Sequence, residues 1–318
     1  MDWTSGRTRR AFSVFAWLVL AYNVPVILWG AYVRVSFSGD GCGAHWPSCK
    51  GELIPHSMAA PMAIEFTHRM MTSLDSLAVI ALCVWAFLSF PRKHAIRLFS
   101  ILSLVFLLIE ALLGAGLVLL RYVAHDQSAG RPLYLCAHLT NTLLLLGALT
   151  VTAWLAHTRM ERLTWSNIPR PLWGAAIIVI AVSITGVIAA LGDTLFPASS
   201  LAIGMRRDFS SASSLLLRLR LIHPFIALTG AAYIVWASIT ELRRDETSRT
   251  AASRVIVLTL FQLAIGAVNL TLLAPVWMQL IHLFMADLVW IAVVVMVMES
   301  ARATSPVSEA VHATSLTS

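Results

Sequence analysis

The stretch I-E-F-T-H-R at residues 64–69 opens a long apolar run, which extends from Met62 to Phe90. Within it, Glu65 and His68 lie three residues apart, a spacing that makes them neighbours on one face of a helix. Ionisable groups are costly to bury in a membrane, and those found inside a spanning helix usually have a function. The stretch therefore predicts a membrane helix with a candidate site near the end at which it begins.

The rest of the chain has the composition of an integral membrane protein. Of its 318 residues, 58% are hydrophobic and 12% are charged, with a mean hydropathy of +0.78, whereas a soluble domain has about 25% charged residues. Eight apolar runs reach the roughly 20 residues that cross a bilayer. They predict an all-α fold with eight transmembrane helices, at 12–35, 62–90, 96–121, 132–156, 171–192, 215–240, 252–274 and 276–298.

The distribution of lysine and arginine predicts the orientation. Of the 23 such residues, 14 fall on the side that holds both termini and 8 on the other. Because positive residues gather on the cytoplasmic side, we expect a multi-pass protein of the cell inner membrane with both termini cytoplasmic. The net charge of +7 is then explained by topology and by contact with membrane lipids, and no nucleic-acid partner is expected.

The spans divide into two halves of four. We predict a cytoplasmic N-terminus, an N-terminal half, a cytoplasmic linker, a C-terminal half and a disordered cytoplasmic tail, at 1–11, 12–156, 157–170, 171–298 and 299–318.

The two halves resemble each other in sequence. The segment E-A-L-L-G-A-G-L-V from Glu110 lines up with Q-L-A-I-G-A-V-N-L from Gln262. This pattern predicts two pseudo-symmetric four-helix bundles, related as a parallel repeat. Two pairs of histidines match as well, His68 with His223 and His138 with His282.

Two features of the first half have no counterpart in the second. One is the Glu65 carboxyl, and the other is the Gly/Pro-rich outer loop at 36–61, which contains Cys42 and Cys49. Two cysteines seven residues apart on the oxidising side of a membrane can form a disulfide, and we expect one here. Similar scaffolds with different side chains indicate one catalytic half and one supporting half.

The four matched histidines point to haem. Each lies about six to eight residues into an even-numbered span, which is about 9–12 Å below the outer surface. A single buried histidine is more often a helix-to-helix hydrogen bond than a ligand, but four at one depth, two in each half, favour ligands. Imidazoles from facing helices can bind one haem iron from both sides. The sequence thus predicts two bis-histidine haem sites.

Two further interpretations stay open at this point. Glu-x-x-His also occurs in di-iron carboxylate bundles, but these need a second such motif and two more glutamates. Besides Glu65, the spans offer only Glu110, Asp75 and Asp287 as carboxylates, and no second motif.

The second open interpretation concerns two arginines. Arg218 and Arg220, just before His223, are equally compatible with haem propionates and with lipid headgroups.

Several motifs together resemble the haem A synthase family, over nearly all of residues 12–298. They are G-D-G-C-G-A-H-W-P-S-C-K-G-E-L-I-P at 39–55, E-F-T-H-R at 65–69, L-L-G-A at 112–115, and the final set Asn269, Pro275, Trp277 and His282. Each motif alone is weak evidence, and the combination is specific.

The resemblance implies an activity and a set of sites. It implies that His68 and His138 face haem O, the substrate, whose C8 methyl is oxidised to the formyl of haem A, and that His223 and His282 hold a haem b. Glu65 matches the catalytic carboxylate. Cys42 and Cys49 match an outer-loop pair found in many members, and are taken as catalytic with Glu65. One departure is Glu110, where the family pattern leads us to expect glutamine.

Partners and an alternative function complete these expectations. The implied partners are a haem O synthase that delivers the substrate and the assembly of terminal oxidases, with a homo-oligomer left open. The alternative is a di-haem b-type electron-transfer cytochrome without substrate chemistry. It would explain the four histidines, but not why Glu65, Cys42 and Cys49 occur in one half only.

Overall fold

The computed structural model describes residues 6–56, 58–163, 165–209, 215–244 and 246–303, and these residues form helices and no β-strand. The elements are α1 (Gly6–Val35), α2 (Ala60–Ser89), α3 (Ala95–Leu119), α4 (Gly130–Thr158), the 3-10 turn η1 (Trp165–Asn167), α5 (Arg170–Leu195), α6 (Leu201–Asp208), α7 (Leu215–Arg220), α8 (Ile222–Arg244), α9 (Arg249–Thr271) and α10 (Val276–Ala303).

Within the described ranges, eight helical segments are long and apolar enough to cross a membrane, with α7 and α8 sharing one span at Leu217–Arg244. This confirms the predicted fold class, an all-α protein with eight transmembrane helices. The chain is therefore a multi-pass membrane protein.

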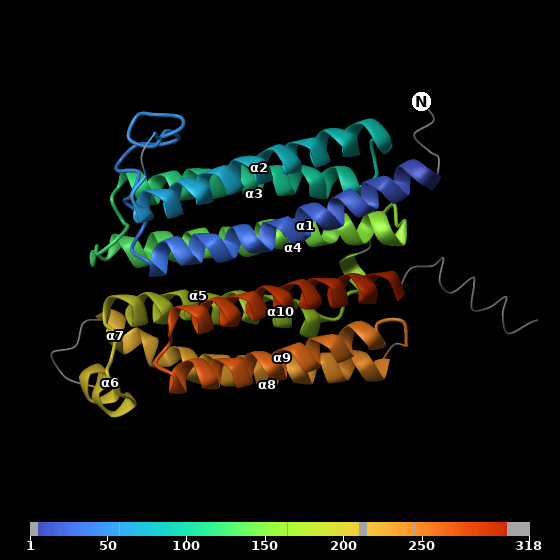
Figure 1. Ribbon diagram of the computed structural model, residues 1–318. Coiled ribbons are helices and arrows are strands. Elements are labelled where there is room, and N and C mark those ends of the chain that lie inside the picture. The colour runs from blue at the N-terminus through green and yellow to red at the C-terminus, as the bar shows by residue number, and fades with distance from the viewer. Residues whose placement is uncertain (1–5, 57, 164, 210–214, 245, 304–318) are drawn as a thin grey trace, which may run out of the picture.

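The helices form two groups (Figure 1). Helices α1 to α4 pack together, as do α5, α8, α9 and α10, and the groups meet where α1 and α4 face α5 and α10. Helix α4 lies in the middle and is the most buried span. Helices α2, α4, α8 and α10 all begin at the end that carries the 36–61 loop. The pseudo-symmetric relation of the groups stays a prediction.

Indole hydrogen bonds tie α4 to α10 across the boundary. Trp290 Nε1 donates to the Leu143 carbonyl at 2.7 Å, and Trp154 Nε1 donates to Glu299 Oε1 at 2.7 Å. Lipid is as apolar as the side chains, so helix association in a membrane depends on close packing and such interhelical bonds. They join the two groups along much of the length of α4.

Prolines explain several helix boundaries. Pro61 and Pro171 lie in the first turns of α2 and α5, where a missing N–H costs nothing. Pro224 separates α7 from α8, because it cannot bond to the Arg220 carbonyl four residues earlier and its ring crowds that carbonyl. The sixth predicted run is therefore interrupted at Leu221.

Three other boundaries differ from the sequence prediction. The segment expected to be a loop after the fifth span contains α6. Helix α1 begins at Gly6, inside the predicted N-terminus 1–11, and α10 continues to Ala303, inside the predicted tail 299–318. Residues 1–5 and 304–318 of those two predicted segments lie outside the described residues.

Candidate functional site

The four histidines occupy corresponding places in four helices. His68 and His138 are each the ninth residue of their helices, α2 and α4. His223 is the ninth residue counted from the start of α7, and His282 is the seventh of α10. All four helices begin at the same end of the molecule (Figure 1), so the helix bounds place the four side chains near that end.

His223 and His282 face each other in the second half. Their ring centroids are 6.4 Å apart, with the ring planes at 79°. Two imidazoles that bind one metal from opposite sides, each at about 2 Å, have centroids about 6 Å apart. The buried His282 Nδ1 has no hydrogen-bond partner among the described residues, while His223 Nδ1 lies 3.0 Å from Thr185 Oγ1. The pair therefore fits a haem iron held between α8 and α10.

Three of the four histidine rings lie against a glycine of a neighbouring helix. A Cβ added to Gly30 would lie 3.0 Å from His68 Cε1, and one added to Gly186 would lie 3.1 Å from His223 Cε1. Contacts this short would force the histidine ring to move, so the imidazoles can keep their present positions only if these residues are glycine. The third case is Gly266, whose added Cβ would lie 2.9 Å from His282 Cε1.

His138 breaks this pattern. Gly114, which matches Gly266 in the repeat, has nothing within 4 Å of an added Cβ. Instead, His138 Nδ1 lies 3.0 Å from Oε1 of Glu110 on α3. The ring N–H does not point straight at that oxygen, so the contact is a close electrostatic one and not a well-aligned hydrogen bond. His68 lies within electrostatic range of both His138 and Glu110.

The Glu110 carboxylate is held in place by α4. Asn141 Nδ2 donates to its Oε2 at 2.6 Å and also to the Phe106 carbonyl at 2.8 Å. The Thr142 hydroxyl lies between Glu110 Oε1 and the His138 carbonyl, and can donate its one proton to either. Sequence reasoning noticed Glu110 as unusual but gave it no partner, since His138 lies on another helix.

Glu65 is buried beneath the outer loop. The residue is 3% exposed, and its Oε2 accepts a 2.8 Å hydrogen bond from the Cys42 backbone N–H. Cys42 and Cys49 form a disulfide, which confirms the predicted bond. Cys42, Cys49, Met62 and the flanking Phe66 form a small apolar cluster at this point. The loop and α2 thus join the carboxylate to the backbone of Cys42, one of the two disulfide cysteines.

Arg69 completes this arrangement, and sequence reasoning gave it no role. Its guanidinium donates to Glu65 Oε1 at 2.5 Å, and to the carbonyls of His45 and Ser48 at 2.8 and 2.6 Å. One arginine therefore fixes both the carboxylate and the loop. The signal was present in the sequence, because Glu65 and Arg69 are four residues apart and such pairs meet on a helix.

Two other arginines have partners that the sequence did not predict. Arg220 is bound by Asp208, with contacts of 2.6 and 2.7 Å, and by Asp193 at 3.1 Å. Its charge is matched within the protein, which favours neither a propionate nor a headgroup. Arg34 of α1 reaches the second half, where it donates to the Ala190 carbonyl at 2.9 Å. It thereby links α1 to α5 at the histidine end.

The described residues contain no group of three or more His, Cys, Asp or Glu that could hold a metal ion by themselves. These described residues therefore offer no ligand set for the di-iron site considered above. A pair of histidines is the complete set of protein ligands in a bis-histidine haem, in which the porphyrin supplies the other four ligands.

Comparisons with known proteins agree with these features. Residues 13–294 match the family model described as COX15-CtaA, cytochrome oxidase assembly protein. The chain is 40% identical over 281 residues to a protein of Thermus thermophilus named "Protoheme IX farnesyltransferase", and the match covers 87% of this chain and 46% of that protein.

Two relatives carry another name. "Heme A synthase" of Exiguobacterium sibiricum is 39% identical over 109 residues, and "Heme A synthase" of Halalkalibacterium halodurans is 38% identical over 109 residues; each match covers 34% of this chain and 37% of the relative. The matches thus span about half, or less, of the length of these curated relatives. The family model, in contrast, covers all eight spans. The chain belongs to the COX15-CtaA family of cytochrome oxidase assembly proteins, the haem A synthase family.

Proposed function

We propose that the protein is a haem A synthase, which oxidises the C8 methyl of haem O to a formyl group by successive hydroxylations. The observation that carries this proposal is the asymmetry between two similar halves. Each half holds a pair of histidines near the same end, but among the described residues only the first has a buried carboxylate, Glu65, bonded to the backbone of a disulfide cysteine, Cys42, whose partner is Cys49.

The first half is proposed to hold the substrate. His68 on α2 and His138 on α4 would bind the haem O iron from its two sides, and the apolar helix faces would accept the porphyrin. Glu65 lies one turn before His68 on α2. If His68 holds the iron, the Glu65 carboxylate would be a proton acceptor for a substituent at the edge of the ring and would not be a ligand of the iron.

The chemistry needs an acceptor for protons and one for electrons. Each hydroxylation replaces one C–H bond of the methyl carbon by a bond to an oxygen atom taken from water, which releases two electrons and two protons. The doubly hydroxylated carbon then loses water to give the formyl group. Glu65 would take the protons, and Arg69, which now donates to it, would stabilise the carboxylate between steps. The Cys42–Cys49 disulfide can accept two electrons and two protons to become two thiols.

The second half is proposed to hold a haem b between His223 and His282. The 6.4 Å separation of the two rings supports this assignment. Haem b, when bound, would supply a one-electron acceptor. No described carboxylate is within ion-pair distance of His223 or His282, which suits a haem that is kept and not modified.

Pigment analysis separates this proposal from the b-type cytochrome alternative. The protein would be purified from cells that make haem O, and its extracted pigments resolved by reversed-phase chromatography. A haem A synthase carries hydroxylated or formylated haem besides haem b. A preparation that holds only haem b, even when haem O is supplied, would favour the electron-transfer cytochrome.

The proposed surroundings follow from this activity. The Thermus relative is named for the farnesylation of protohaem, which supports a haem O synthase as the source of the substrate. We further propose that the protein lies in the cell inner membrane with both termini in the cytoplasm. Its product, haem A, would pass to the assembly of terminal oxidases.

A further inference from the structure

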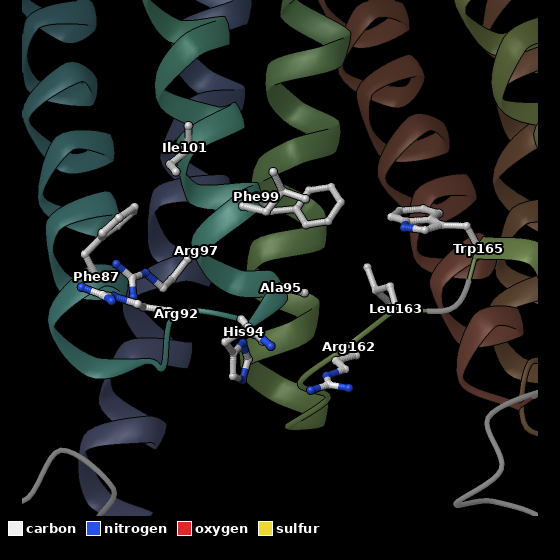
Figure 2. A pocket seen from close by; sticks show the side chains of 12 residues that line it. Phe87, Arg92, His94, Ala95, Arg97, Phe99, Ile101, Arg162, Leu163 and Trp165 are labelled. Atoms are coloured by element: carbon white, nitrogen blue, oxygen red, sulfur yellow. The ribbon is translucent and has the colours of Figure 1, made fainter.

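Figure 2 shows a pocket of about 710 Å³. It lies where α2 ends and α3 begins, at the opposite end of the molecule from the starts of α2, α4 and α10 and hence from the histidines (Figure 1). Its wall comes from the end of α2, the α2–α3 turn, the start of α3 and the segment that joins the two halves. Four cations line it, Arg92, Lys93, Arg97 and Arg162. Nothing in the proposed activity uses this pocket.

The four cations have no acidic partner in the part of the chain that the structure describes. Among the described residues, no carboxylate lies within ion-pair distance of any of the four. In Figure 2 the guanidinium groups of Arg92 and Arg97 lie together beside Phe87, and Arg97 stands 4.0 Å above that ring. Arg162 lies on the far side of His94. The pocket therefore presents unpaired positive charge from two directions.

His94, between them, adds no fifth charge. Burial lowers the pKa of its imidazole, Arg9 acts in the same direction, and Glu161 opposes them. The neutral ring accepts a 3.2 Å hydrogen bond from the Ile96 N–H at Nδ1. His94 thus caps α3 and forms the floor between the cations.

The rest of the lining is apolar and lies at the boundary of the spans. Leu98 and Ile101 are 53% and 39% exposed on α3, and Trp165 is 40% exposed. Exposed aliphatic side chains next to a tryptophan are typical of the level where a bilayer meets water. A ligand here meets positive charge at one end and a lipid-facing surface at the other.

We propose that this pocket binds the headgroup of an anionic phospholipid, with the phosphate at Arg92, Arg97 and Arg162 and the acyl chains along Leu98 and Ile101. Basic pockets between helices are known to take such headgroups on the cytoplasmic side, which is the side predicted for this end. The lipid would join the α2–α3 turn to the segment between the halves.

The test compares lipid binding by the full-length protein and two triple variants. In nanodiscs of phosphatidylcholine with increasing phosphatidylglycerol, native mass spectrometry and thermal unfolding would measure retained lipid and the stabilisation that bound lipid gives. In the triple glutamine variant (Arg92→Gln, Arg97→Gln, Arg162→Gln) we expect binding of phosphatidylglycerol to fall about a hundredfold, since each cation near a membrane surface contributes about fivefold. The corresponding triple lysine variant should keep most of the binding.

The controls distinguish a specific lipid site from a general effect of surface charge and from a site for a free anion. Arg243→Gln removes an exposed cation in the last turn of α8, at the end of the molecule where the pocket lies. This variant should leave lipid binding unchanged. Equal retention of phosphatidylglycerol by the parent and the glutamine variant would overturn the proposal, as would equal retention of phosphatidylcholine and phosphatidylglycerol by the parent. Full displacement of the lipid by millimolar inorganic phosphate would also overturn it, in favour of a site for a free anion.

Discussion

The two halves of the molecule surround their histidines with different chemistry. In the first, His138 lies 3.0 Å from the Glu110 carboxylate, and Glu65 is bonded to the loop that carries the disulfide. In the second, His223 contacts the Thr185 hydroxyl and His282 has no side-chain partner among the described residues. The side-chain partner in the first pair is thus the Glu110 carboxylate beside His138, while His68 Nδ1, like His282 Nδ1, has no partner among the described residues; the partner in the second pair is the neutral Thr185 hydroxyl.

Under the proposed function, this difference would separate a half that holds a haem from a half that changes one. In the second half, glycine contacts on both rings and the absence of a described carboxylate within ion-pair distance would suit two ligands that only hold a haem. In the first half, a carboxylate bonded to the loop that carries the disulfide would offer a bound substrate acceptors for both protons and electrons. If the halves are a repeat, as the sequence predicts, the same scaffold would be used twice and the side chains would give each half a different task.

The largest expected effect is the loss of haem b from the second half. In His223→Ala or His282→Ala the iron would lack one protein ligand, so the low-spin haem b spectrum should disappear from the purified protein. His157→Ala, at the exposed opposite end of α4, is the matched control and should keep the spectrum. If either variant retained the full low-spin spectrum, the assignment of this pair would be wrong.

The next effect should appear only in the first half. Glu65→Gln keeps the shape of the side chain but removes its acid–base function, which is worth about 100- to 10,000-fold in rate. We expect near-normal haem b, with haem O or a partly oxidised haem accumulating instead of haem A. Glu246→Gln, on an exposed residue paired with Arg249, should change nothing. Formation of haem A at close to the parent rate would make Glu65 structural.

Much of the fold and part of the site could be predicted from the sequence. Span number follows from runs of about 20 apolar residues, and the place of His68 or His282 follows from counting along a helix. The disulfide was predictable because Cys42 and Cys49 are close in the chain. Each of these features depends on local sequence alone.

The contacts between distant segments could not be predicted in this way. Glu110 meets His138 from another helix, and Arg34 of α1 reaches the Ala190 carbonyl of α5, 156 residues further along the chain. Such contacts depend on how the helices rotate and pack, and periodicity leaves this undetermined. The interruption before α8 could have been predicted from Pro224, because proline has no N–H to donate to the Arg220 carbonyl four residues earlier.

A pair of glycine substitutions would sharpen the comparison between the halves. Gly266 and Gly114 are equivalent in the repeat, yet only at Gly266 does an added methyl group meet a histidine, at 2.9 Å. Displacing a ligand in this way commonly costs about 10- to 100-fold in metal affinity. Gly266→Ala should therefore lower haem b retention about tenfold, and Gly114→Ala should leave both haem sites unchanged. Equal behaviour of the two variants in a haem-transfer assay would show that the glycine contacts do not matter.

The smallest expected effect concerns the pair Glu110 and Gln262, which occupy matching places in α3 and α9. Gln262 Nε2 donates to the His282 carbonyl at 3.1 Å, while its Oε1 and His282 Nδ1 are both buried without partners among the described residues. A carboxylate next to Nδ1 gives an imidazole more anionic character, and such outer partners tune the bound metal. Replacing Glu110 by glutamine should therefore raise the reduction potential of the first-half haem by tens of millivolts, about 59 mV being a tenfold change in the equilibrium. The reverse substitution, Gln262→Glu, should lower the potential of haem b.

Spectroelectrochemical titration of the two haems would show both shifts. If Glu110→Gln moved neither potential while its haem content stayed normal, the carboxylate would only position α4, and the difference between the halves would lie with Glu65 and the disulfide alone.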